Sequence, residues 1–152
     1  MDEEKVKEWL RSYIYLRQEV DARLERIARM KSREQFAEHK DSDGSKHTAS
    51  GNDRMANAII RRMMYVDSIA TELEAKMDEM DAITAAVDRL EDAQEREILR
   101  LRYIDCEECR HTAWRDIAFD MYGDDDEAQL KMVFRIHKRA IENIGRMKQC
   151  KE

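Results

Sequence analysis

The chain has 152 residues, of which 42% are hydrophobic, 41% are charged and only 7% are aromatic. It contains no proline and only four glycines, and its formal net charge is −6. This composition is typical of an all-α protein with long, uninterrupted helices, and it argues against a large globular core. The negative charge argues against a protein that coats DNA indiscriminately, although a localised basic helix remains compatible with it.

No stretch of the sequence approaches the roughly 18 consecutive apolar residues of a membrane span. The acidic residues 1–4 do not resemble a signal peptide. The three cysteines, Cys106, Cys109 and Cys150, are odd in number and fit a reducing compartment without a disulfide framework. We therefore expect a cytoplasmic protein that does not associate with a membrane.

Two long helices are predicted in the first part of the chain, over residues 2–38 and 54–90, with a polar, glycine-containing and mobile loop over 39–53. In the first helix, apolar residues recur at steps of three and four: Val6, Trp9, Tyr13, Leu16, Val20, Leu24, Ile27 and Met30. In the second, a heptad-like seam consists of Ile59, Met63, Val66, Ala70, Leu73, Met77 and Met80, and then shifts to Ile83, Val87 and Leu90.

The two helices have similar lengths, so the loop allows one to fold back on the other. We therefore expect residues 1–90 to form a long antiparallel helical hairpin, that is, a coiled coil. Each apolar seam needs a partner, either the other helix or a second copy of the chain. We expect both kinds of pairing, which makes the protein a homodimer.

Residues 91–152 predict a compact domain of three shorter helices. Asp92 is expected to cap a helix over 93–103, and a polar link covers 105–110. Thr112 is expected to cap the next helix, which Gly123 ends.

The last helix, 130–148, carries two different faces. Its apolar stripe consists of Val133, Ile136, Ala140, Ile144 and Met147. Its opposite side carries Lys131, Arg135, Lys138 and Glu142, flanked by Phe134 and Arg139. The basic row could be an ordinary solvated helix face. Together with the short helix ahead of it, however, it indicates a helix-turn-helix that presents cations to a polyanion.

Segments 95–103, 114–118 and 133–141 resemble the fourth region of bacterial sigma factors. They look more like the phage-encoded regulators that carry this region behind a coiled coil, including the RinA- and ArpU-like late-transcription activators. The opening of the second long helix, residues 53–56, also resembles that group. The resemblance covers roughly residues 54–147.

The resemblance implies that the last helix enters the major groove of double-stranded promoter DNA. Lys131, Phe134 and Arg135 fall at positions of base contacts, whereas Lys138 and Arg139 fall at positions of phosphate contacts. It also implies RNA polymerase as a candidate partner, contacted through the hairpin or the first short helix.

The sequence departs from that family pattern at two places. Ala113 stands where the family has Thr, and an acidic stretch over 123–127 replaces a short glycine turn. The last helix therefore either starts early or follows a longer loop. The acidic run lacks the alternating spacing of a calcium loop and is expected to act as a counter-charge at the start of the helix.

Cys106, Cys109 and His111 raise the possibility of a zinc site, for which only Cys150 and His137 remain as distant further ligands. We instead expect reduced thiols, no metal and no cofactor. No nucleophile–base pair or phosphate-binding glycine loop is evident, so we expect no enzyme.

The sequence therefore favours a DNA-binding transcription regulator, a phage or prophage late-gene activator acting at a promoter. Two alternatives remain open. One is a phage DNA-packaging protein resembling a small terminase subunit, which would assemble as a ring. The other is a coiled-coil adaptor that binds only protein.

Overall fold

The computed structural model describes residues 1–41, 50–107 and 109–150, and these residues form helices and connecting turns with no strand. The expected all-α class is therefore confirmed. The chain divides into two compact units. The core unit comprises Met1–Gln18 and Met77–Glu152, and the two-helix unit comprises Glu19–Lys76.

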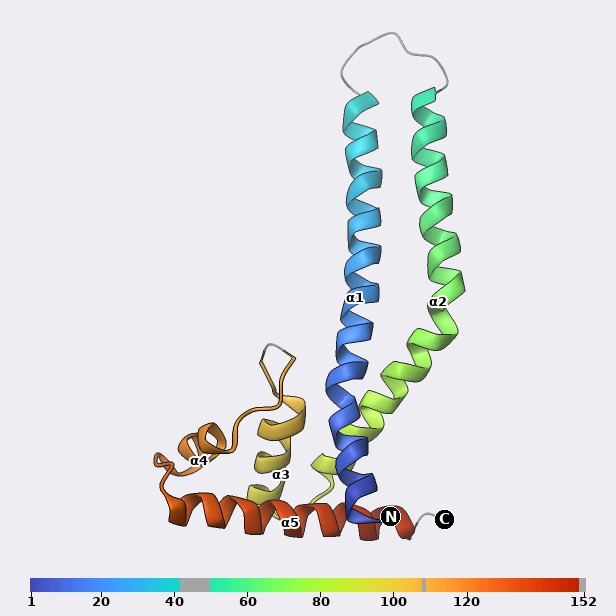
Figure 1. The fold of residues 1–152 in the computed structure, drawn as a ribbon. Helices are drawn as coiled ribbons and strands as arrows, with labels where there is room; N and C mark the ends of the chain where they lie inside the picture. Colours follow the sequence, from blue (N-terminus) through green and yellow to red (C-terminus); the bar gives the residue numbers. More distant parts are fainter. Residues whose placement is uncertain (42–49, 108, 151–152) are drawn as a thin grey trace. The chain divides into compact units, whose positions relative to one another are not determined.

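Six helical segments follow one another along the chain (Figure 1). They are α1 (Glu3–Asp41), α2 (Ser50–Asp88), α3 (Ala93–Leu99), a π-helical segment η1 (Arg100–Ile104), α4 (Trp114–Tyr122) and α5 (Glu127–Gln149). The loop predicted over 39–53 is shorter than expected, because 39–41 and 50–53 are helical. The rest of that prediction, over 42–49, lies outside the described residues.

In the two-helix unit, α1 and α2 run side by side in opposite directions (Figure 1). Three ion pairs establish the direction, because the residue number rises on α1 as it falls on α2. The pairs are Glu19–Lys76, Arg23–Glu72 at 3.6 Å and Glu34–Arg62 at 2.6 Å. The buried apolar contribution is small: among the described residues of this unit, Val20 and Ile69 are the buried hydrophobic ones, each 5% exposed.

The seam predicted for α2 was partly wrong. Met63 and Met77 are 55% and 45% exposed, and Leu24, predicted inside on α1, is 47% exposed. Ile69, outside the predicted seam, is buried instead. A straight helix of 3.6 residues per turn drifts relative to a strict heptad, and the ion pairs of Arg62 and Lys76 turn those positions toward α1.

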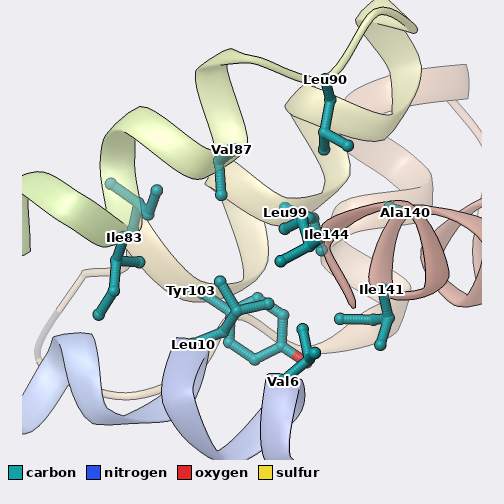
Figure 2. Packing of buried hydrophobic residues seen from close by; sticks show 11 residues of the cluster. Val6, Leu10, Ile83, Val87, Leu90, Leu99, Tyr103, Ala140, Ile141 and Ile144 are labelled. Atoms are coloured by element: carbon teal, nitrogen blue, oxygen red, sulfur yellow. The ribbon is translucent and has the colours of Figure 1, made fainter. Parts of the chain in front are cut away.

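The core unit contains two apolar clusters. The larger one joins the start of α1 and the end of α2 to α3, η1 and α5 (Figure 2). It consists of Val6, Leu10, Ile83, Val87, Leu90, Leu99, Tyr103, Ile104, Ala140, Ile141 and Ile144. The smaller one joins α3, α4 and α5 and consists of Ile98, Ile117, Ala118, Val133 and Ile136. The expected division near residue 90 stays a prediction, since the residues on both sides of it pack in one unit.

The ends of the short helices agree with the sequence at two places and differ at one. Asp92 caps α3, since its carboxylate accepts hydrogen bonds from the backbone N–H groups of Gln94 and Glu95 at 2.8 and 3.4 Å. Gly123 ends α4 in the left-handed conformation, with φ 71°. The prediction that Thr112 caps α4 was wrong. Ala113 occupies that position and offers no side-chain acceptor.

The last helix starts earlier than expected. The Asp126 carboxylate accepts a hydrogen bond from the backbone N–H of Gln129 at 2.9 Å, so Asp126 caps α5. Of the two alternatives left open by the sequence, the structure therefore supports the early start, and residues 123–126 form the whole connection from α4. No helix within the described ranges has both the length and the apolar character needed to cross a membrane.

Replacing Ile144 with Ala should destabilise the core unit. The Ile144 side chain is fully buried in the larger cluster, and truncating a buried isoleucine costs about 2–5 kcal/mol. Ile60→Ala is the matched control, because Ile60 is also helical but 52% exposed. Thermal unfolding followed by circular dichroism should show a large drop in Tm for Ile144→Ala and little change for Ile60→Ala. Equal drops would contradict this assignment of the core.

Candidate functional site

Helix α5 has one face in the core and one face in solvent. Val133, Ile136, Ala140 and Ile144 are buried, as the sequence predicts, and Met147 is half-buried. The buried face is wider than predicted, because His137 and Ile141 also lie inside. The opposite face is exposed at Lys131, Phe134, Arg135 and Lys138. Burying one face fixes which side chains remain available to a partner.

The exposed cations of α5 are only weakly engaged by their own helix. Lys131 lies 3.1 Å from Glu127, and Lys138 lies 4.0 Å from Glu142. The two lysine side chains are 70% and 67% exposed, and ion pairs of this kind contribute at most about 1 kcal/mol. Arg135 forms no ion pair with any residue that the structure describes. These three cations are therefore free to exchange their partners for an anion.

Phe134 is the apolar member of the exposed face. Its ring meets Trp114 edge-on, with centroids 5.1 Å apart, while 46% of the residue stays exposed. Trp114 itself contacts η1 and α5, because the Arg102 guanidinium lies 4.4 Å above its ring and the ring centroid of His137 lies 4.8 Å from its own. This arrangement agrees with the wedge-like position that the sequence suggests for Trp114, and it holds Phe134 in a defined orientation.

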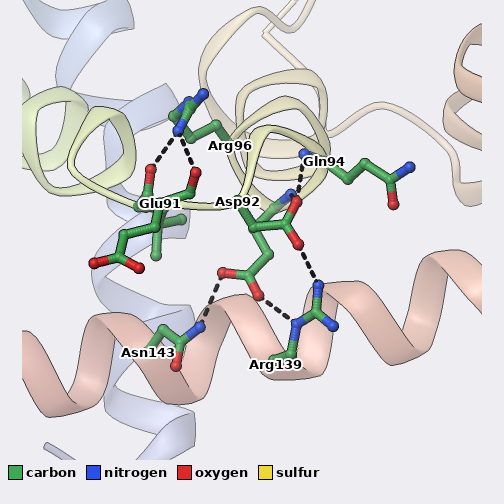
Figure 3. Close-up of polar contacts among 8 residues, drawn as sticks. Glu91, Asp92, Gln94, Arg96, Arg139 and Asn143 are labelled. Carbon is green, nitrogen blue, oxygen red and sulfur yellow. Dashed lines mark hydrogen bonds and ion pairs between the residues drawn. The ribbon is translucent and has the colours of Figure 1, made fainter.

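Arg139 differs from the other cations of α5 because carboxylates already hold it (Figure 3). Its guanidinium lies 2.6 Å from the Asp92 carboxylate and donates a further hydrogen bond to Glu95. The hydrogen bond to Glu95 is the main reason that the pKa of Arg139 is raised. The contact of Arg139 with phosphate, expected from the sequence, stays a prediction. In the structure Arg139 joins α5 to the start of α3.

Glu95 is a buried carboxylate at the centre of this network. It is 2% exposed and accepts hydrogen bonds from Arg139 and from the Asn143 amide at 2.9 Å (Figure 3). Sequence reasoning missed it. The available signal was its place three residues after the N-cap Asp92, where a Glu often occurs at the start of a helix.

His137 was also missed as a core residue. Its Nε2 lies 2.9 Å from the Tyr103 hydroxyl. Burial, followed by the nearby cations Lys7, Arg102 and Arg11, lowers the pKa of His137 to about 4. The spacing of His137 from Val133 and Ala140 places it on the apolar stripe, which was a signal in the sequence. Its imidazole is neutral at neutral pH.

The cysteine region has a structural arrangement. Cys106 is buried, with its sulfur 3.0 Å from the carbonyl oxygen of Arg102, whereas Cys109 is exposed. Arg17 donates hydrogen bonds to the carbonyl oxygens of Ile104 and Cys106 at 2.9 and 2.8 Å. Within the described residues, no three His, Cys, Asp or Glu side chains come together as metal ligands. The expected absence of a metal stays a prediction.

Comparison of the chain with protein-family models, curated proteins and solved structures found no match. The resemblance to phage regulators with a sigma-like fourth region therefore stays a prediction, and the argument about function depends on the geometry of α4 and α5.

Acidification should destabilise the protein through His137. Its pKa in the folded state, about 4, lies below its ordinary value of 6.5. Between these values the unfolded chain binds more protons, so this contribution to stability is complete above the unfolded pKa and is lost as the pH falls toward the folded pKa. The loss between about pH 7 and pH 5 is about 2 kcal/mol. His137→Gln, which can still hydrogen-bond Tyr103, should show a smaller fall in Tm over this range; an identical fall would contradict the assignment.

Arg139→Ala should cost more stability than Lys138→Ala. The first substitution removes a hydrogen bond from the buried Glu95 carboxylate, and hydrogen bonds to charged groups contribute about 1.5–3 kcal/mol. The second removes only a 4.0 Å pair between exposed side chains. Urea unfolding at neutral pH measures both. If the two variants unfold at the same urea concentration, Arg139 has no such structural role.

Proposed function

We propose that α4 and α5 form the helix-turn-helix of a DNA-binding transcription regulator, with α5 as the helix that enters the major groove. In this proposal the protein is a phage or prophage late-gene activator acting at a promoter in the cytoplasm. The observation that carries the proposal is the exposed, cationic face of α5 in a chain whose net charge is −6. Localised positive charge in an acidic protein favours a polyanionic partner at that face over non-specific coating.

The dimensions of α5 suit this role. Lys131, Arg135 and Lys138 follow one another at steps of four and three residues, which forms a row of about 10 Å along one side of a helix. The major groove of B-DNA is about 12 Å wide and admits an α-helix. The four-residue connection over 123–126 and the contact of α4 with α5 in the smaller cluster support a rigid pair of helices.

The exposed residues divide into two proposed roles. Arg135 is free to make paired hydrogen bonds to guanine O6 and N7, and Phe134 offers an apolar edge to a thymine methyl group. Lys131 joins them at the base edges, and Lys138 contacts phosphate. Arg139 also lies near the expected phosphate position, but phosphate would have to compete with Asp92 and Glu95 for its guanidinium.

Acidic residues near α4 support a single direction of approach. Asp116, Asp120, Asp124 and Asp125 are described, and Arg115 lies 3.6 Å from Asp125 as a partial counter-charge. Phosphate would be repelled from this part of the unit and attracted to the exposed row of α5. The same distribution supports a specific orientation on DNA.

The wider arrangement, a coiled-coil hairpin followed by a helix-turn-helix, belongs to this proposal, as do a homodimer and RNA polymerase as partners. The small buried seam of the two-helix unit supports a second copy. Ile60, Met63 and Met64 recur at steps of three and one on α2 and are 52%, 55% and 66% exposed. Exposed apolar side chains gathered on one helix face often mark a protein interface.

The test separates base contacts from phosphate contacts. Arg135→Ala should lower the preference for a cognate duplex over a scrambled duplex by about 1–3 kcal/mol. Lys138→Ala should weaken both complexes equally and reduce the log–log salt slope by about 0.9. Cognate fragments come from selection among fragments that neighbour the gene, with fluorescence anisotropy as the measurement. Absence of binding to every fragment at low salt would refute the proposal, and ring-shaped assemblies in light scattering would favour the packaging class.

A further inference from the structure

Exposed arginines gather in the two-helix unit, apart from the site on α5. We name them the arginine face. It consists of Arg26, Arg29 and Arg33 on α1 and Arg54 and Arg61 on α2, and all five are exposed. A groove of about 450 Å³ is lined by the three arginines of α1 together with Met30.

The two rows lie on the same side of the helix pair. Arg26, Arg29 and Arg33 follow one another at steps of three and four, so they share one side of α1. On α2, Arg54 and Arg61 lie eleven and four residues before Tyr65, which places them on its side of the helix. The guanidinium carbon of Arg26 lies 4.3 Å from the centre of the Tyr65 ring. This contact brings the two rows together.

Carboxylates of the unit do not neutralise this face. Glu34 pairs with Arg62, Glu72 pairs with Arg23 and Lys76, and Glu19 pairs with Lys76. In contrast, Arg29, Arg33, Arg54 and Arg61 form no ion pair with any residue that the structure describes. Glu25, four residues before Arg29, is an exposed acid at the edge of the row. Like charges this close repel one another, and a bound polyanion would relieve that repulsion.

We propose that the arginine face binds the phosphate backbone of double-stranded DNA and forms a second DNA-binding surface that acts independently of α5. A guanidinium is planar and can donate two parallel hydrogen bonds to a phosphate, which suits it to this ligand more than a lysine ammonium. From Arg26 to Arg33 the row spans about 10 Å. A DNA strand carries a charge about every 3.4 Å along the axis, so a straight row of this length can meet successive phosphates.

Backbone contacts carry no sequence information. The arginine face therefore contributes affinity and salt dependence for any duplex, whereas the proposed contacts of α5 supply the preference for one sequence. The inference does not require α5 to read DNA, because the two surfaces belong to different units of the chain.

The test uses the full-length protein and a duplex of scrambled sequence. In the variant Arg26→Gln, Arg29→Gln, Arg33→Gln, loss of three phosphate contacts should make the log–log salt slope shallower by up to about 2.7. The matched control removes three exposed cations of the core unit, Lys5→Gln, Arg11→Gln and Arg89→Gln. It should keep the wild-type slope. The triple Arg→Lys variant keeps the charge and should keep most of the slope. Circular dichroism verifies that helix content is unchanged.

Two further arms make the outcome specific. The variant Lys131→Gln, Arg135→Gln, Lys138→Gln should lose the preference for the cognate duplex but still bind scrambled duplex, which separates this inference from the function proposed for α5. A wild-type slope in the arginine-to-glutamine variant would overturn the inference. So would an equal loss in the control variant, or a loss of affinity for an acidic protein or for single-stranded DNA but not for duplex.

Discussion

The position of α5 depends on one buried carboxylate. Glu95, in the first turn of α3, accepts hydrogen bonds from Arg139 and Asn143, which lie one helical turn apart on α5. A charge buried to this degree is costly unless it is paired and hydrogen-bonded. These contacts therefore fix both the rotation and the axial position of α5 against α3. Asp92 adds to this constraint, since it caps α3 and also binds Arg139. Any shift of α5 along its axis would leave Glu95 without its partners.

The fixed rotation of α5 determines what the helix presents to solvent. Its buried face contributes to both apolar clusters, so it contacts the ends of α1 and α2 on one part and α4 on the other. His137 remains neutral in this interior and hydrogen-bonds Tyr103. The exposed row of Lys131, Arg135 and Lys138 is a consequence of that burial. A rigid helix with a defined cationic face loses little conformational entropy when it binds.

Positive charge in this acidic chain gathers in separate places. The proposed DNA-reading face is on α5, and the arginine face lies on the two-helix unit. Carboxylates neutralise other cations at short range, as Glu34 does for Arg62 and Glu72 does for Lys76. Cations left without such partners retain their attraction for phosphate. A net negative charge therefore restricts anion binding to these faces and reduces adhesion elsewhere.

The sequence by itself determined the helical class, the N-cap at Asp92, the end of α4 at Gly123 and four buried positions of α5. These features depend on local rules, namely side-chain spacing, capping acceptors and the left-handed conformation that glycine allows. Tertiary structure decided the inward positions of α2, where pairing of Arg62 and Lys76 with α1 displaced Met63 and Met77 from the predicted seam. It also decided the role of Arg139, whose carboxylate partner Glu95 lies 44 residues away in the sequence. Periodicity describes one helix at a time, whereas these contacts depend on which helix faces which, and at what rotation.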